Sequence, residues 1–176
     1  AGLSAAKKGL AIAVRYATRR RQFAPGPNQP ETLIMDYPSH QRRLLPLLAK
    51  AYALSFGLDD LLERFVNNGE EDFREVETLA AGMKSYATWF TTETLQECRE
   101  ACGGKGYLAE NQLAALKADS DIFTTFEGDN TVLMQLVAKG VLSQFKQAFH
   151  EEGNMAVLRI LSQRISVAIN EQNPLI

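Results

Sequence analysis

The sequence predicts an all-α protein, an antiparallel four-helix bundle with a short extra C-terminal helix. Apolar residues recur three and four positions apart over several long segments, which is the period of a helix with one buried face. No segment alternates between apolar and polar residues over the length of a strand. Short connections containing Gly, Pro and Asn join the long segments, and short connections favour antiparallel neighbours.

The first helix is expected to run from the N-terminus to about Arg21, with Ser4 as its candidate N-cap. Residues 23–30 contain three prolines and one glycine. Proline fixes φ and lacks a donor N–H, so we expect this stretch to form a loop. The inward face of the first helix is predicted to consist of Leu3, Lys7, Leu10, Val14 and Ala17.

The second helix is expected to begin at Pro38, with Ser39 as its candidate cap, and to end at the Asn-Asn-Gly stretch of residues 67–69. Pro46 lies inside this helix and is expected to bend its first turns. Its predicted inward stripe is Leu44, Leu48, Tyr52, Ser55, Leu58, Leu62 and Phe65.

The third helix is expected to run from about Asp72 to the pair Gly103 and Gly104. Glycine readily adopts the left-handed conformation that ends many helices, so this pair is a suitable terminus. The predicted buried face is Val76, Leu79, Met83, Ala87, Phe90 and Thr94.

The remaining sequence predicts a short helix within residues 108–118 and a connector over residues 119–128. Asp129 is expected to cap a fourth long helix, and Asn154 to cap the short extra helix. The inward residues of the fourth helix are predicted to be Val132, Leu136, Val141, Phe145 and Phe149. Those of the extra helix are predicted to be Leu158, Leu161, Ile165 and Ala168.

The chain is expected to form one helical domain over residues 1–176, because this length suits one core. The bundle core is expected over about residues 3–150, and residues 151–176 are expected to start a C-terminal extension. The chain begins without Met and inside a helical pattern, so we expect it to be a piece of a longer protein.

Composition narrows the classes of function. The formal net charge of −2 gives no strong field to attract nucleic acid or anionic lipid. No apolar run approaches the roughly 20 residues that span a bilayer. Cys98 and Cys102 are four positions apart with no histidine near them, which favours buried thiols over metal ligands. We therefore expect no nucleic-acid, membrane or metal site, and a reducing intracellular compartment.

Two motifs could bind phosphate. The arginine run of residues 19–21 could hold anionic oxygens, although a solvated helix end that complements the dipole is the favoured interpretation of this run alone. The stretch Gly103-Gly104-Lys105-Gly106 lacks the Lys-Ser/Thr ending of a phosphate loop and follows a helix instead of a strand. A helix terminus explains it equally well, but its glycines would also let a cofactor approach the backbone closely.

The sharpest chemical feature is Glu127, which lies between Phe126 and Gly128 just ahead of the predicted helix cap. It could simply favour the positive end of the helix dipole. It could also be a general base in an apolar pocket, where desolvation would raise its pKa towards neutrality. Composition and spacing leave both interpretations open.

Four segments in order resemble the acyl-CoA oxidase and dehydrogenase superfamily. They are Tyr-Ala-Thr-Arg-Arg-Arg-Gln-Phe (16–23), Tyr-Pro-Ser-His-Gln-Arg-Arg-Leu (37–44), Gln-Glu-Cys-Arg-Glu-Ala-Cys-Gly-Gly-Lys-Gly-Tyr (96–107) and Thr-Phe-Glu-Gly-Asp-Asn-Thr-Val (125–132). The resemblance covers most of the chain from residue 1 to about 149 and implies the helical C-terminal domain of an acyl-CoA dehydrogenase-like fold. The Phe-Glu-Gly-Asp-Asn stretch (126–130), Glu97-Cys98 and the Ala-Thr-Trp stretch (87–89) resemble the oxidase branch.

The resemblance implies that Glu127 removes the α-proton of an acyl-CoA while FAD takes the β-hydride, giving trans-2-enoyl-CoA in fatty acid β-oxidation. Molecular oxygen would then be reduced to hydrogen peroxide. Phe126 and Gly128 would flank the substrate, and Gly128 would let the thioester pass the backbone. The FAD-binding positions that it implies are Arg20, Gln22, Phe23, Gln41, Gly103, Gly104, Asp129 and Asn130. Arg20, Gly103 and Gly104 would contact the FAD of a partner subunit.

The chain departs from the family pattern at Ala24, where dehydrogenases usually have Gly, and at Glu100, where they have a cofactor-contacting Gln. The family's N-terminal helical domain, its middle β-domain and the oxidases' second C-terminal helical domain lie outside this sequence. The resemblance therefore implies that the chain by itself is inactive and binds FAD weakly or not at all.

The resemblance also implies a homodimer formed through this domain, in the cytoplasm of a bacterium or the peroxisome of a eukaryote. One alternative is the same domain of an acyl-CoA dehydrogenase that passes electrons to an electron-transfer flavoprotein. A second alternative is a non-catalytic helical interaction module, against which the presence of Glu127 argues.

Overall fold

The structure is a computed structural model that describes residues 1–67 and 73–152, together with residues 155, 159 and 162. The described chain is almost entirely helical, which confirms the predicted all-α class. Its α-helices are α1 (Gly2–Ala17), α2 (Pro38–Asn67), α3 (Phe73–Ala101), α4 (Leu113–Asp121) and α5 (Asn130–Glu152).

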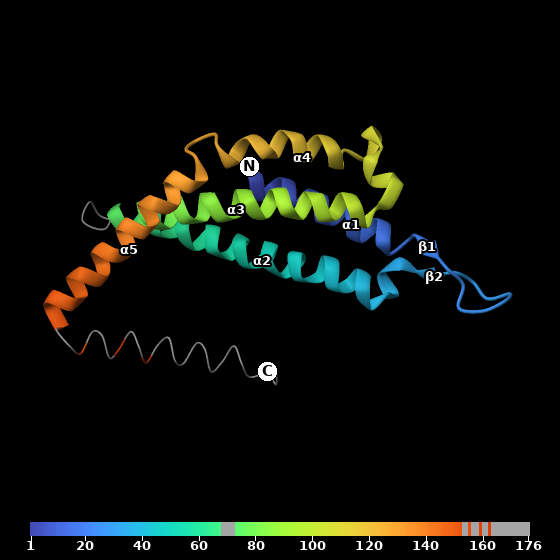
Figure 1. The fold of residues 1–176 in the computed structure, drawn as a ribbon, viewed down its shortest axis with the longest axis horizontal. Coiled ribbons are helices and arrows are strands. Elements are labelled where there is room, and N and C mark those ends of the chain that lie inside the picture. Colours follow the sequence, from blue (N-terminus) through green and yellow to red (C-terminus); the bar gives the residue numbers. More distant parts are fainter. Residues whose placement is uncertain (68–72, 153–154, 156–158, 160–161, 163–176) are drawn as a thin grey trace.

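Helix α3 is the centre of the fold and packs against α1, α2, α4 and α5. From α1 to α4, consecutive helices run in alternating directions (Figure 1), as the bundle prediction requires. The fourth helix position of the bundle is filled by two shorter stretches, because α4 and α5 pack against different halves of α3. The C-terminal half of α3 contacts α4, where Lys117 Nζ donates to Gln96 Oε1 at 2.5 Å. The N-terminal half contacts α5, where Gly140 lies against Thr78.

Helix α1 ends at Ala17, four residues before the predicted end at Arg21. The chain beyond it forms a short hairpin, in which β1 (Arg21–Gln22) pairs antiparallel with β2 (Thr32–Leu33). Residues 23–30 form the predicted loop at the tip of this hairpin, which projects from the bundle in Figure 1. Ser4 is not the N-cap, because the helix already starts at Gly2 and Ala1 takes that position without a side-chain bond.

Helix α2 begins at Pro38 as predicted, and proline suits the first helical position because its missing N–H has no partner there. Ser39 therefore lies inside the first turn and is not the cap, and the helix continues through Pro46. The predicted buried stripe of α2 lies about one position too far along the sequence from the residues that are buried in the structure. Apart from Leu44, the buried residues are Leu47, Ala51 and Leu54, whereas Tyr52, Leu58, Leu62 and Phe65 are exposed.

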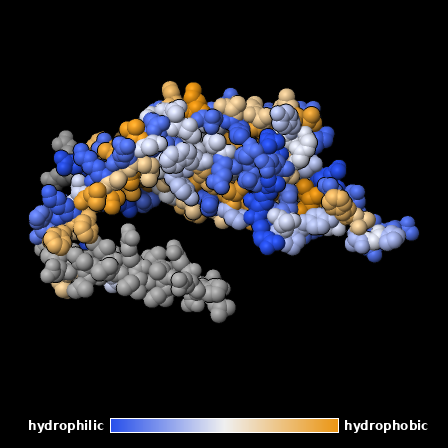
Figure 2. Space-filling view, viewed as in Figure 1, coloured by the Kyte–Doolittle hydropathy of each residue, from blue (hydrophilic) through white to orange (hydrophobic). Residues whose placement is uncertain are grey.

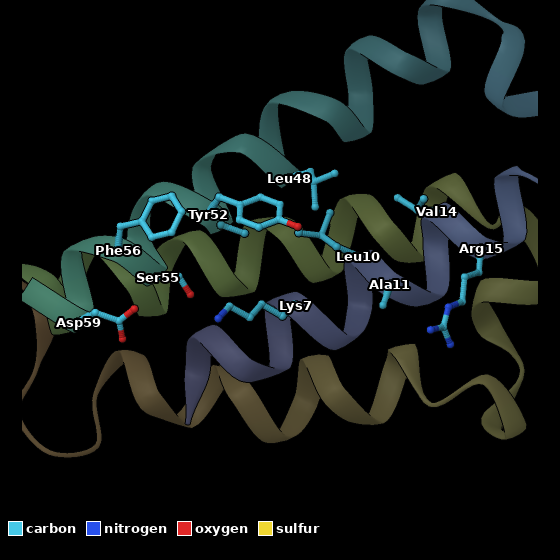
Figure 3. A pocket seen from close by; sticks show the side chains of 11 residues that line it. Lys7, Leu10, Ala11, Val14, Arg15, Leu48, Tyr52, Ser55, Phe56 and Asp59 are labelled. Carbon is cyan, nitrogen blue, oxygen red and sulfur yellow. The ribbon is translucent and has the colours of Figure 1, made fainter.

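A second apolar stripe on α2 explains this error. Leu48, Tyr52 and Phe56 line an open cleft of about 530 Å³ against Leu10 and Val14 of α1. Figure 3 shows these α2 side chains facing the side chains of α1 across the cleft. Two adjacent apolar stripes at helical spacing cannot be ranked from the sequence, because only packing decides which of them is covered.

The predicted buried face agrees with the structure better for α3 than for α5. On α3, Val76, Phe90 and Thr94 are buried as expected, whereas Leu79 is 42% exposed. The other predicted residues of α3, Met83 and Ala87, are partly buried. On α5 the prediction was wrong for Val132, Val141, Phe145 and Phe149, which are all between 42% and 60% exposed, whereas the fifth residue, Leu136, is partly buried.

The reason is that α5 packs mainly against α3 and then extends away from the bundle (Figure 1). Apolar side chains consequently remain on the surface over α5 (Figure 2). The predicted short helix within residues 108–118 is displaced towards the C-terminus as α4, which extends into the predicted connector. The extra helix predicted after Asn154, and most of residues 151–176, lie outside the described residues.

Candidate functional site

The turn that carries Glu127 has an unusual backbone. After the 3-10 turn η5 (Ile122–Thr124), both Glu127 and Gly128 have positive φ angles, 60° and 108°. A left-handed conformation is common for glycine but uncommon for glutamate, and such outliers concentrate at functional sites. The turn leaves Glu127 exposed at the start of α5.

The described residues do not provide the apolar pocket expected around Glu127. The Glu127 side chain is exposed, and its neighbour Phe126 is 54% exposed. The ring of Phe126 makes an edge contact with Phe123, with centroids 6.2 Å apart. If the Glu127 carboxylate is shielded from water, the shielding atoms must therefore belong to something other than the described residues of this chain.

A buried polar network fixes this turn to α3. Asn130 is 1% exposed, and its Nδ2 donates to the Ser85 carbonyl at 3.2 Å and to Thr88 Oγ1 at 2.9 Å. Lys84 Nζ donates to Asn130 Oδ1 at 2.9 Å and to the Gly128 carbonyl. The side-chain amide of Asn130 is thus fully hydrogen-bonded to residues of α3. These bonds fix the position of the Glu127 turn relative to α3.

Asp129 caps α5 as predicted, since its Oδ1 accepts from the backbone N–H groups of Thr131 at 2.9 Å and Val132 at 3.2 Å. Asp129 and Asn130 thus both have structural roles at the helix start. Their assignment to FAD binding stays a prediction.

A second cluster lies at the C-terminal end of α3, and we call it the FAD cleft because the resemblance predicts cofactor contacts for several residues that line it. It is a cleft of about 520 Å³ between the end of α1, the hairpin, the start of α2 and the end of α3. Five of the eight predicted cofactor positions line it: Arg20, Gln22, Phe23, Gly103 and Gly104. The structure therefore brings together residues that lie about 80 positions apart in the sequence.

Gln41 does not line the FAD cleft. Its Nε2 donates to the Met35 carbonyl at 3.0 Å, which holds the short turn before α2. Gly103 has a φ of +56°, which confirms the predicted left-handed terminus of α3. A side chain added at Gly104 would meet nothing within 4 Å, so this part of the backbone is open to an approaching ligand.

Sequence reasoning missed Arg43 and His40, which also line the FAD cleft. Arg43 on α2 pairs with Glu97 at 2.5 Å and with Glu100, both on α3. A hydrogen bond from Gln96, followed by the Arg43 guanidinium, holds the pKa of Glu100 below its usual range. Glu97 and Glu100 lie three positions apart and so share one face of α3, but the sequence gives no sign that their basic partner lies on α2.

His40 Nε2 is buried and has no hydrogen-bond partner among the described residues. Burial, reinforced by the nearby Arg43 guanidinium, lowers the pKa of His40. The imidazole is therefore neutral at physiological pH and offers an unused polar atom beside the FAD cleft.

The two clusters are separated along α3. The Glu127 turn is anchored at Ser85 and Thr88, whereas the first residue of α3 that lines the FAD cleft is Glu100. At about 1.5 Å per residue, the nearest of these positions, Thr88 and Glu100, lie about 18 Å apart along the helix axis. One small reacting group cannot touch both clusters at once.

The two cysteines lie in the core of the bundle. Burial raises the pKa of Cys98 to about 12, and Cys102 is buried as well, which fits the expected buried thiols. Within residues 1–67 and 73–152, no group of His, Cys, Asp and Glu side chains could hold a metal ion. None of the described helices is long and apolar enough to cross a membrane.

Comparison with known proteins identifies relatives over most of the chain. The family model described as acyl-CoA oxidase, C-alpha1 domain, matches residues 2–142. Acyl-coenzyme A oxidase 3, peroxisomal, of Arabidopsis thaliana is 50% identical over 140 residues, which are 80% of this chain and 21% of that protein. Acyl-coenzyme A oxidase 2, peroxisomal, of the same plant is 41% identical over 178 residues, covering 99% of this chain and 26% of that protein.

Solved structures agree with these relatives. Acyl-CoA oxidase 1 of Arabidopsis thaliana superposes with a TM-score of 0.72 at 36% identity, over 84% of this chain and 24% of that one. Acyl-CoA oxidase-1 of Caenorhabditis elegans, solved in complex with FAD and ATP, gives 0.79 at 27% identity, over 85% of this chain and 23% of that one. The chain thus spans about a quarter of the length of these relatives.

Proposed function

This chain belongs to the acyl-CoA oxidase family, matching its C-alpha1 domain, and we propose that it is the flavin-facing helical domain of an enzyme that desaturates acyl-CoA. The products would be trans-2-enoyl-CoA and hydrogen peroxide, formed in fatty acid β-oxidation. The observation that carries the proposal is the structure around Glu127, an exposed carboxylate in a left-handed turn that α3 holds in place. The dehydrogenase alternative is not favoured, because the matching family model and relatives are oxidases.

In this mechanism the carboxylate of Glu127 takes the α-proton of the acyl thioester. A general base must lie within hydrogen-bond reach of the proton it removes, and the network of Asn130 and Lys84 keeps the turn at one position. Gly128 has no side chain and a left-handed φ of 108°, and the Leu133 side chain lies where a Cβ would stand, so glycine lets the turn pack closely beside the carboxylate. FAD, when bound, supplies the hydride acceptor and passes the electrons to oxygen.

The residues of the FAD cleft fit an FAD molecule. Arg20 is exposed at its edge and offers a planar fork of donors for a pyrophosphate. Gly104 gives open backbone, Phe23 offers a flat apolar ring that is 69% exposed, and His40 offers an unpartnered buried nitrogen. Glu100 faces the same cleft as an anion, but it forms ion pairs with both Arg43 and Arg99.

The experiment that tests the activity uses a full-length oxidase that carries this domain. With acyl-CoA and oxygen, we expect hydrogen peroxide to form in amounts equal to the enoyl-CoA. If the flavin were reduced by acyl-CoA but released electrons only to an electron-transfer flavoprotein, the dehydrogenase alternative would replace the oxidase proposal.

The separation of about 18 Å along α3 supports a second part of the proposal, which is a homodimer with shared sites. Glu127 would act at the FAD of its own subunit, and Arg20 would hold the FAD of the partner subunit. Each active site would then need residues from both copies, as an isologous two-fold dimer allows.

This arrangement predicts complementation between inactive subunits. A purified heterodimer of one Glu127→Gln subunit and one Arg20→Glu subunit is expected to regain about half of the wild-type rate, because one of its two sites is intact. The matched control pairs a wild-type subunit with one that carries both substitutions, and it should be inactive. The reverse result, an active control and an inactive heterodimer, would show that both residues serve one FAD within a subunit.

The names of the relatives support a peroxisomal compartment. Similar acyl-CoA oxidases of Arabidopsis thaliana and Homo sapiens are named peroxisomal. As part of the proposed function we assign this protein to the peroxisome, where peroxide-forming oxidation of acyl-CoA would take place.

A further inference from the structure

The segment that carries three of the predicted cofactor residues, Arg20, Gln22 and Phe23, is held by the chain that returns from the hairpin loop. The Arg20 carbonyl accepts from the Ile34 N–H at 2.9 Å, and the Phe23 carbonyl accepts from the Thr32 N–H at 3.0 Å. Between these two bonds, Gln22 pairs with Thr32. The returning chain therefore shapes the backbone of this side of the FAD cleft.

Phe23 combines a strained backbone with an exposed ring. Its φ is +61°, a left-handed value that is uncommon for residues other than glycine, above all for bulky ones. Its ring is 69% exposed and lines the FAD cleft. Both features are unfavourable in the chain by itself, since the left-handed backbone is strained and the ring leaves apolar surface in water. A ligand that covers the ring would offset the second of these costs.

The side chain of Tyr37 holds the backbone of this strained residue. Its hydroxyl donates to the Gln22 carbonyl at 2.8 Å and makes a longer contact of 3.4 Å with the Phe23 carbonyl. These carbonyls belong to the two planar peptide groups that flank the Phe23 Cα. Because the orientations of these two groups define φ and ψ of Phe23, one hydroxyl group contacts both parts of the backbone that must stay in place.

The Tyr37 hydroxyl is itself held in place by the bundle. The Tyr37 ring packs against the hydrophobic core, directly before Pro38 at the start of α2. Its carbonyl accepts from the N–H groups of His40 at 2.9 Å and Gln41 at 3.0 Å, in the first turn of that helix. The hydroxyl therefore reaches the hairpin from a fixed position at the start of α2.

Strand pairing alone does not account for these contacts. The pairing ends at Gln22 and Thr32, and paired strands favour negative φ values. Phe23 departs from that conformation directly after the last pair, at the point that the Tyr37 hydroxyl contacts. The contacts of Tyr37 thus act on the bend of the chain at Phe23, beside the cleft that both residues line.

We propose that Tyr37 is a positioning residue of the FAD cleft, whose hydroxyl keeps Phe23 left-handed and so keeps its ring in the wall that covers the cofactor. This inference rests on the proposed function, which places FAD in this cleft. The cofactor would lie between the Phe23 ring and the open backbone of Gly104, in the 3-10 turn η3 (Gly103–Tyr107). A wall that is already in place reduces the ordering cost of binding.

The test removes FAD from a full-length oxidase that carries this domain and measures its rebinding by the change in flavin fluorescence. Tyr37→Phe removes only the hydroxyl oxygen and is expected to weaken FAD binding by about 3- to 10-fold, the contribution of one hydrogen bond. Amide hydrogen exchange at Thr32 of the FAD-free protein should become faster in this variant, because that N–H bonds to the Phe23 carbonyl. Tyr52→Phe, the same change at an exposed tyrosine of α2 outside the FAD cleft, should alter neither measurement.

A double-mutant cycle separates positioning of the ring from general support of the hairpin. Glycine adopts a left-handed backbone without strain, so Phe23→Gly removes both the ring and the need to hold it. Phe23→Gly is expected to weaken FAD binding by about 10-fold or more, and adding Tyr37→Phe to it should cause no further loss. Equal losses from Tyr37→Phe with and without Phe23→Gly, or no loss from Tyr37→Phe in the wild-type chain, would overturn the inference and leave the FAD cleft in place. Unchanged binding in Phe23→Gly would instead remove Phe23 from the proposed cofactor site, and the inference with it.

Discussion

Replacement of Glu127 by Gln in a full-length oxidase that carries this domain is expected to abolish nearly all acyl-CoA-dependent peroxide release. A positioned general base contributes about 10²- to 10⁴-fold to a proton transfer, and the amide cannot accept the α-proton. The change keeps the size of the side chain and the strained turn, so the fold and the FAD content should be retained. Peroxide release and flavin absorbance, measured on the same sample, check both parts of this expectation.

The matched control is Glu93→Gln, the same chemical change at an exposed glutamate of α3 outside both clusters. Its peroxide release should equal that of the wild type. An unchanged rate in Glu127→Gln would remove Glu127 from the role of base. A loss of bound FAD in Glu127→Gln would mean that the variant fails through the cofactor, so the loss of rate could not be assigned to proton transfer.

The Glu127 turn shows what a sequence can reveal about this site and what it cannot. The carboxylate, the glycine after it and the helix cap at Asp129 were visible as a pattern, and the cap is confirmed. The left-handed backbone of Glu127 and the burial of Asn130 were not predictable, because both depend on where α3 lies. Propensity describes one segment at a time, whereas this network joins residues more than 40 positions apart.

The same distinction applies to the helices. Periodicity predicted that the long helices exist, because an amphipathic pattern is a local property. It misplaced the buried stripe of α2 and the inward face of α5, because each has more apolar surface than its neighbours cover. The end of α1 was missed for a related reason. Arg21 and Gln22 pair with Thr32 and Leu33 across the loop, and this pairing competes with continued helix.

The FAD cleft could be assembled from the sequence only through the family resemblance. Arg20 and Gly104 are far apart in the chain, and no local pattern connects them. Arg43, whose side chain joins α2 to α3 through Glu97 and Glu100, was missed because ion pairs between helices leave no periodic signal. The packing of α1, α2 and α3 around one end of the bundle creates the cleft.

The glycine motif after α3 gives the largest expected effect on stability. Gly106→Ala should reduce the free energy of unfolding by about 3 kcal/mol or more, the upper range for an overpacked site. The added Cβ would lie 2.0 Å from the carbonyl oxygen and 2.8 Å from the carbonyl carbon of Arg99. These are backbone atoms, so no side-chain rotation can relieve the overlap and the whole turn must move. Thermal unfolding of the full-length protein, with hydrogen exchange read at α3 and η3, measures this loss.

The neighbouring glycines separate structure from cofactor binding. Gly104→Ala meets no atom within 4 Å and should leave stability within about 0.5 kcal/mol, as for an open surface position. Gly103→Ala should lower the free energy of unfolding by about 1–2 kcal/mol, because its φ of +56° is left-handed.

If FAD packs on this backbone as proposed, Gly104→Ala should release flavin although the protein stays folded, since the new methyl group would occupy the open face of the cleft. Equal unfolding of the Gly104 and Gly106 variants would contradict the close packing of Gly106, whereas full flavin retention by a stable Gly104→Ala variant would move the cofactor away from that glycine.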